Sequence, residues 1–345
     1  MSLTNHRSET HISWSANGQT TDVRIDGEVA FDEDLADVRS LSDGGHLAIR
    51  ESSGGLTRTI DITSIDGKLT REYHVGGKLR PWSAEAQQLL HDQLLKLVRH
   101  SAIGAQARVR SIHARRGAAG VLDEIALLEG DYARRVYVTH LLELDSPSGD
   151  TVEKILTVVE KQMSSDYDRA EILGRLADRA TSNDRTNAGF VRAAAAMKSD
   201  YDKRRVLEQL IAKARLNGES KAAVLAAAAA MRSDYDRAQV LTAYVASAGF
   251  ESAVAAPFVT AVNAMTSDYE KRRVLTAVAS KGVRSNSLPD LFGAVDLMHS
   301  DYDRAQVLLA FAPVVDASTR PAFMASAGRI RSKYDQDRVL GSISR

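Results

Sequence analysis

The chain has 345 residues, enough for two domains or for one elongated array of repeats. Apolar residues make up 44% of it, charged residues 26%, and six residues are proline, which is the composition of a folded protein and excludes a largely disordered chain. The formal net charge is zero and the isoelectric point is near 7.2. These values argue against nucleic acid as a partner, because nucleic-acid binding draws much of its affinity from a basic surface.

The sequence contains no cysteine, so disulfide bonds and thiolate metal sites are excluded. Its longest apolar runs are rich in alanine and are shorter than the ~20 residues that span a bilayer, so we expect no membrane insertion. The N-terminal stretch MSLTNHRSETH is polar and lacks the apolar core of a signal peptide. We therefore expect a soluble protein, cytoplasmic as written or periplasmic if a signal peptide has been removed. The sequence leaves the compartment and the oligomeric state open.

An antiparallel β-rich domain is predicted for residues 1–80. Two Asp-Gly pairs, Asp26-Gly27 and Asp66-Gly67, are each flanked by alternating apolar and polar residues, which predicts hairpins with type I′ turns. A third hairpin is predicted across residues 52–55. The three hairpins together give six short strands, which we expect to form an antiparallel meander or a small sandwich. The residues expected on the buried face are Val23, Ile25, Val29, Leu47, Ile49, Ile60, Ile62, Leu69 and Tyr73.

From Ser83 onward the pattern is helical. Apolar residues recur at helical spacing in EAQQLLHDQLLKLVRH, and Ser83, with Gln87 nearby, is a suitable start for a helix. Residues 83–345 are therefore predicted to be all-helical, and the whole chain to be an α+β protein in which α predominates.

Internal repeats organise this helical part. Seven tyrosines recur at separations of 32 to 35 residues, and the words around them include SDYDKRRVL and SDYDRAQVL. They are Tyr132, Tyr167, Tyr201, Tyr235, Tyr269, Tyr302 and Tyr334. Since one helix pair cannot bury its apolar face alone, we predict a stacked αα solenoid of about seven units of ~34 residues, similar to tetratricopeptide or HEAT arrays. The Trp, Leu-Gly and Pro marks of tetratricopeptide units are missing.

Each residue of the repeated word has a predicted local role. The serine, as in Ser199, caps a helix, and the acid three residues on, as in Asp202, completes a capping box. The basic residue two after the tyrosine, as in Lys203, is predicted to form a surface ion pair with the aspartate before the tyrosine. The methionine two before the serine, as in Met197, is predicted to lie in the core. Asn217-Gly218 is predicted to separate the two helices of a unit as a helix stop.

The side chains expected on the surface of the array repeat every two units, because KRRVL at residues 203–207 and 271–275 alternates with RAQVL. The arginines allow two interpretations: they form basic patches that bind a partner, or they form lateral salt bridges between repeats. The tyrosines also allow two: they line a groove that binds a peptide, or they pack between repeats. The candidate partner-binding residues are Arg204, Arg205, Arg272, Arg273, Tyr201, Tyr235 and Tyr269.

The SDY[DE]KRRVL words resemble the helical repeats of a set of bacterial proteins, including the regions downstream of the peptidase part in some relatives of the BlaR1-type membrane metallopeptidases. The resemblance covers roughly residues 83–345. The HExxH string of those peptidases is absent from this sequence. The resemblance therefore implies a sensor-like or scaffold-like region and transfers no catalytic residue.

No sequence motif indicates catalysis. The nine histidines have no pair at the i,i+4 spacing of a helical zinc site, and the chain has no GxSxG, GxGxxG or GxxxxGK[ST] string. The paired acids of the Asp-Tyr-Asp word could ligate calcium in principle, but capping and ion pairing already account for them. We therefore expect no cofactor and a non-enzymatic scaffold that binds a protein or peptide. The alternatives are a ligand-sensing module whose β-rich domain recognises the ligand, and a hydrolase of unrecognised type.

Overall fold

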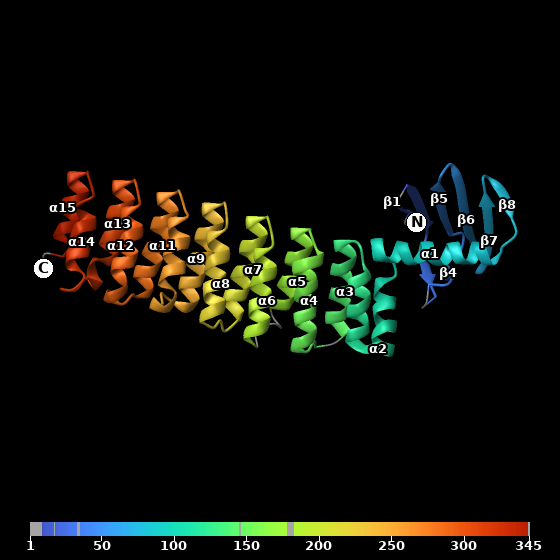
Figure 1. Cartoon of the computed structure of the whole chain (residues 1–345), viewed down its shortest axis with the longest axis horizontal. Coiled ribbons are helices and arrows are strands. Elements are labelled where there is room, and N and C mark those ends of the chain that lie inside the picture. The colour runs from blue at the N-terminus through green and yellow to red at the C-terminus, as the bar shows by residue number, and fades with distance from the viewer. Residues whose placement is uncertain (1–8, 17, 33–34, 145, 178–182, 344–345) are drawn as a thin grey trace, which may run out of the picture. The chain divides into compact units, whose positions relative to one another are not determined.

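The computed structural model describes residues 9–16, 18–32, 35–144, 146–177 and 183–343. It confirms an α+β fold in which helix predominates, with 15 α-helices and an antiparallel sheet in the described part of the chain (Figure 1). The chain divides into two compact units, Met1–Ser146 and Pro147–Arg345. Strand gives way to helix between Arg80 and Ala84, and the proposed domain boundary at residues 80–83 stays a prediction.

The sheet in the first unit has six antiparallel strands in the order β1-β2-β5-β6-β7-β8, and β3 pairs with β4 as a separate hairpin. The strands are β1 (Glu9–Ala16), β2 (Gln19–Asp26), β3 (Val29–Phe31), β4 (Val38–Leu41), β5 (His46–Ser53), β6 (Leu56–Ile65), β7 (Lys68–Val75) and β8 (Lys78–Arg80). The expected buried face is confirmed except at Val29 and Leu69, which are half-buried.

Two of the three predicted hairpins are confirmed, and the one at Asp26-Gly27 is wrong. Asp66 and Gly67 both have positive φ and join β6 to β7, while Gly54 and Gly55 join β5 to β6. At Gly27, by contrast, the chain leaves the sheet: β2 pairs with β1 and β5, and β3 pairs with β4. A Cβ on Gly27 would lie 2.1 Å from the Ser42 hydroxyl oxygen, so this glycine permits a close approach.

Three helices complete the first unit: α1 (Ala84–Ser101), α2 (Ala105–Leu127), which is kinked at Gly117, and α3 (Asp131–Leu144). Helix α1 begins as predicted, because the Ser83 hydroxyl accepts the Ala86 N–H at 3.4 Å. It runs across the sheet (Figure 1). A buried polar network joins the two, since Gln93 of α1 donates to the buried carboxylate of Glu51, which also pairs with Arg58.

The second unit is a row of paired helices (Figure 1). They are α4 (Gly149–Gln162), α5 (Asp166–Ala177), α6 (Asp184–Ala195), α7 (Asp200–Lys213), α8 (Gly218–Ala229), α9 (Asp234–Ala248), α10 (Ala255–Asn263), α11 (Asp268–Lys281), α12 (Leu288–Asp296), α13 (Asp301–Phe311), α14 (Arg320–Ala327) and α15 (Lys333–Gly341). Odd-numbered helices pack on odd and even on even, so the row has two layers, and the predicted solenoid packing is confirmed here. None of the helices in the described residues combines the length and apolar character needed to cross a membrane.

The serine caps of the odd-numbered helices are confirmed, but the capping box is only half formed. The hydroxyls of Ser199, Ser233 and Ser300 each accept the backbone N–H three residues on, at 3.2 Å. The reciprocal bond predicted from the acid at that third position is replaced by a bond from another repeat. The N–H of each capping serine is donated to an aspartate about one repeat earlier in the chain, for example from Ser233 to Asp200 at 2.8 Å.

These inter-repeat aspartates hold successive units together. Each accepts two consecutive backbone N–H groups of the next repeat through one carboxylate oxygen, at 2.6–3.2 Å. They are Asp166, Asp200, Asp234, Asp268 and Asp301. Because the bonds are charge-assisted and partly buried, we expect them to stabilise the fold more than ordinary helix caps do.

The basic residue of the word is buried, which corrects the prediction of a surface ion pair. Arg237 is 4% exposed and lies 2.9 Å from Asp234, as expected, but it also donates to the carbonyl oxygens of Ala228 and Met231 at the end of the preceding helix. The guanidinium thus satisfies carbonyl groups that a helix terminus leaves unpaired. The methionines are buried as predicted, at 1–3% exposure: Met163, Met197, Met231, Met265 and Met298.

Asn217 and Gly218 separate α7 from α8 as predicted, but Asn217 acts at the start of α8 and not as the stop of α7. Helix α7 ends at Lys213, and the Asn217 side chain accepts the Ser220 N–H at 2.8 Å as the N-cap of α8. Asparagine is favoured at this position for the same reason as serine, because its side-chain oxygen reaches the first turn.

We expect the stability of the array to fall at acid pH through Asp234. Burial alone would raise the pKa of Asp234, but bonds from Ser267 and Thr266 and the charge of Arg237 outweigh it, so the pKa is lowered. A carboxylate with a lower pKa in the folded chain stabilises the fold above its unfolded pKa of about 3.9, and that contribution is lost as the pH falls through the folded pKa. The free-energy difference between wild type and Asp234→Asn, measured by urea unfolding, should therefore be smaller at acid pH than at neutral pH. An unchanged difference would contradict this assignment.

Candidate functional site

Exposed tyrosines mark one surface of the second unit. Each lies in the first turn of an odd-numbered helix, directly after an inter-repeat aspartate, and each is 52–58% exposed. They are Tyr167, Tyr201, Tyr235, Tyr269 and Tyr302. More than half of each residue faces solvent, so none of these tyrosines is buried. The two alternatives, a groove that grips a peptide and packing between repeats with the hydroxyl at the surface, both stay predictions.

Arginines lie between these rings. Arg204 Cζ is 5.2 Å from the ring centroid of Tyr201 and 6.0 Å from that of Tyr235, on the next odd-numbered helix. Arg272 Cζ lies in the same way 5.0 Å from Tyr269 and 5.5 Å from Tyr302. A guanidinium at this distance is attracted to the ring quadrupole.

Arg273 reaches the opposite way along the row, to 5.9 Å from the Tyr235 ring on the preceding odd-numbered helix. We call the surface formed by these side chains the tyrosine–arginine ladder, and define it as Tyr201, Tyr235, Tyr269, Tyr302, Arg204, Arg205, Arg272 and Arg273. An open depression of about 480 Å³ lies on it between α11 and α13, lined in part by Tyr269 and Arg272.

Each of the four arginines is paired with an acid, so the ladder is not a patch of unbalanced positive charge. Arg204 Nε donates to Asp236 on the next odd-numbered helix at 2.7 Å, and Arg272 Nε lies 2.8 Å from Asp303. Burial alone would lower the pKa of Arg204, but the bond to Asp236 and the charge of Glu208 raise it above its usual value. These side chains therefore act as lateral ion pairs whether or not they also contact a partner.

The other two arginines point to the preceding repeat. Arg205 donates to Glu171 at 3.1 Å, and Arg273 donates to Gln239 at 3.2 Å and to Glu270 of its own helix at 2.6 Å. One KRR word thus supplies an arginine to both of its neighbours, and this explains why the word occurs in every second unit. The intervening units carry a buried alanine in place of the first of these arginines, as at Ala238.

The structure brings the sequence-predicted candidates together across neighbouring helices. Tyr201, Tyr235 and Tyr269 lie in one row with Arg204, Arg272 and Arg273, and Arg205 pairs with Glu171 of the preceding repeat. Asp236 and Asp303, which balance the charge of the ladder, were assigned only to helix caps. The sequence signal for their second role is the alternation itself, since each follows a KRR word by one repeat.

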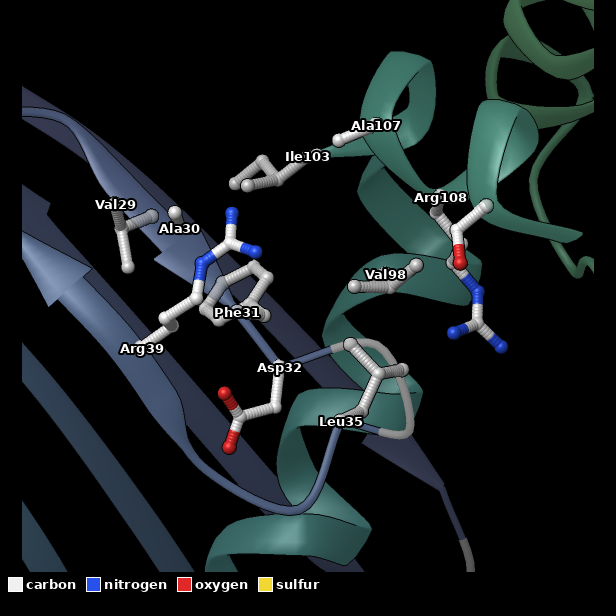
Figure 2. Close-up of a pocket in the computed structure, with 12 residues that line it drawn as sticks. Val29, Ala30, Phe31, Asp32, Leu35, Arg39, Val98, Ile103, Ala107 and Arg108 are labelled. Atoms are coloured by element: carbon white, nitrogen blue, oxygen red, sulfur yellow. The ribbon is translucent and has the colours of Figure 1, made fainter. Parts of the chain in front are cut away.

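A small cavity in the first unit is the other candidate. It has a volume of about 140 Å³ and lies between the β3–β4 hairpin and the α1–α2 segment. Figure 2 shows Phe31 and Arg39 on the hairpin side, with Val98 and Ile103 on the helical side. Its size suits a ligand no larger than a benzene ring.

Within the described part of the chain, no cluster of three or more histidine, aspartate or glutamate side chains is placed to hold a metal ion. Tyr137 and Tyr244 are buried, and burial raises the pKa of Tyr244 to about 12, so it stays protonated at neutral pH. Neither hydroxyl belongs to the ladder.

Comparison with known proteins adds no assignment: no family model, curated protein or solved structure matches the chain.

Proposed function

We propose that the chain is a non-enzymatic scaffold that binds a protein or peptide along the tyrosine–arginine ladder. The observation that carries the proposal is that the four tyrosines of the ladder occupy equivalent positions on successive odd-numbered helices, each more than half exposed. Tyrosine and arginine are enriched among the residues that dominate binding energy at interfaces. Rings held by ion-paired arginines lose little conformational freedom on binding, so the cost of ordering them is small.

The resemblance to the helical regions of BlaR1-type relatives agrees with this proposal, since it implies a sensor-like or scaffold-like part without catalytic residues. The ligand-sensing alternative rests on the cavity between the β3–β4 hairpin and α1–α2. Six of the residues lining that cavity lie beyond residue 82, including Val98 and Ile103, so a test of ligand binding needs the whole chain.

The proposal is tested by affinity capture with a triple variant, Tyr201→Ala, Tyr235→Ala and Tyr269→Ala. Arginine variants are less informative, because removing Arg204 or Arg272 also breaks an ion pair between repeats. We expect a partner captured by the wild type to be lost with the triple variant.

The matched control is the double variant Leu297→Ala and Met324→Ala, which removes two exposed apolar side chains, 53% and 49% exposed, from the end of α12 and from α14. It should capture the partner as the wild type does. Equal capture by all three proteins would move the binding site away from the ladder and favour the first unit.

A further inference from the structure

We infer that the occupant of the tyrosine–arginine ladder is an uncharged, proline-rich segment in the polyproline II conformation. This inference rests on the proposed function and specifies its partner. It is carried by the spacing of the rings, by their charge balance and by the polar character of the side chains between them.

The spacing of the rings is short enough for one turn of polyproline II to reach from one ring to the next. Because Arg204 Cζ lies 5.2 Å and 6.0 Å from the centroids of Tyr201 and Tyr235, the two centroids lie no more than about 11 Å apart. Packed helices place their axes about 8–10 Å apart, which sets the same repeat along the row. Polyproline II rises about 9 Å in each turn of three residues, so every third residue of such a segment can meet a tyrosine.

The charge balance of the ladder favours an uncharged occupant. Each of the four arginines has an acid within 3.1 Å, at Asp236, Glu171, Asp303 and Glu270. A strongly acidic or basic ligand would have to compete with these pairs. A proline-rich segment needs no charge, since its ring packs against an aromatic face.

The side chains between the rings disfavour an amphipathic helix, which needs an apolar groove. Beside the ion-paired arginines, the ladder carries polar side chains such as Gln239 and Thr276. The Tyr235 hydroxyl accepts a bond from Gln239 at 2.8 Å, so its own hydrogen can be donated outward. The backbone carbonyls of polyproline II have no internal partners and can accept it.

The test uses the full chain and capped, fluorescein-labelled peptides in a fluorescence anisotropy titration: 15 consecutive prolines, 6 consecutive prolines and a 15-residue Gly-Ser peptide. By the rise of about 3.1 Å per residue, the longer proline peptide spans the whole ladder and the shorter one spans two rings. We expect the longer one to bind at least roughly ten-fold more tightly, because several contacts are made at once. Tyr235→Ala should weaken its binding by roughly ten-fold, and Leu297→Ala should leave it unchanged.

Binding of the Gly-Ser peptide as tight as that of the prolines, or the absence of a length dependence, would overturn the inference. Tighter binding at the ladder by an amphipathic helical peptide would overturn it as well. If the prolines fail while the triple tyrosine variant still loses a partner captured from a lysate, the occupant is wrong and the proposed function stands. If both fail, both are wrong.

Discussion

Replacing Asp234 with alanine should lower the free energy of unfolding of the chain by about 2–4 kcal/mol. The carboxylate accepts the N–H groups of Thr266 and Ser267 and the Thr266 hydroxyl, and it neutralises the buried guanidinium of Arg237. Its loss leaves that charge without its carboxylate partner and removes the bonds that join the start of α11 to the preceding repeat. Urea unfolding gives the free energy, and amide hydrogen exchange should show faster exchange at Thr266 and Ser267.

The control for this variant is Asp290→Ala, which removes an exposed aspartate from the first turn of α12. It tests the general effect of an acid near a helix N-terminus, about 0.3–1 kcal/mol. Equal effects of the two substitutions would show that Asp234 contributes no more than an ordinary first-turn acid, and that the bonds between repeats add nothing.

Replacing Arg237 with methionine should lower the free energy of unfolding by about 3–5 kcal/mol, because it leaves the partly buried carboxylate of Asp234 without its counter-charge. The carbonyl oxygens of Ala228 and Met231 also lose their donor. Arg237→Lys should cost less, about 1–2 kcal/mol, because the charge remains and only the additional hydrogen bonds are lost.

Lys203 and Lys271 show that a lysine can occupy the position of Arg237 in other repeats of the same chain. They occupy the same position of the repeat and are 5% and 4% exposed. Urea unfolding of both Arg237 variants gives the comparison. A methionine variant as stable as the lysine variant would show that apolar packing can replace the buried charge, and that the ion pair is not needed to hold the repeats.

Local signals in the sequence predicted most of the fold. The serine caps, the buried methionines and the hairpins at Asp66-Gly67 and Gly54-Gly55 depend on residues within a few positions of one another. Such features follow from the backbone geometry that each residue allows, so a single stretch of sequence specifies them.

Two features that depend on distant partners were predicted incorrectly or missed. Asp26-Gly27 has the sequence of a hairpin turn, but the strands on its two sides do not pair with each other. The strand before it, β2, pairs with β1 and β5, and the strand after it, β3, pairs with β4. The inter-repeat aspartates bond to groups 30–33 residues away, which no local rule anticipates. A signal was nevertheless present: the residue before the tyrosine is aspartate in all five central words, whereas the one after it is Asp236 in one word and Glu270 in the next.

The candidate site, too, could be predicted from the sequence only in part. The sequence identified the tyrosines and arginines because they repeat, and the structure supplied their arrangement as a charge-balanced row. The exposure of the rings could not be predicted, because it depends on the angle at which successive helices stack. Since the arginines hold neighbouring repeats as well as the rings, the surface and the array that displays it depend on the same side chains.

Photo-cross-linking from the ladder is the most direct test of its proposed role. A photoreactive benzoylphenylalanine replaces Tyr235 in one protein and Met324, on the layer of even-numbered helices, in another, and both are irradiated in native lysate. We predict a covalent adduct of discrete mass with a second chain from position 235 and none from position 324. No adduct from position 235, or the same adducts from both positions, would contradict the proposal that this chain binds its partner through the tyrosine–arginine ladder.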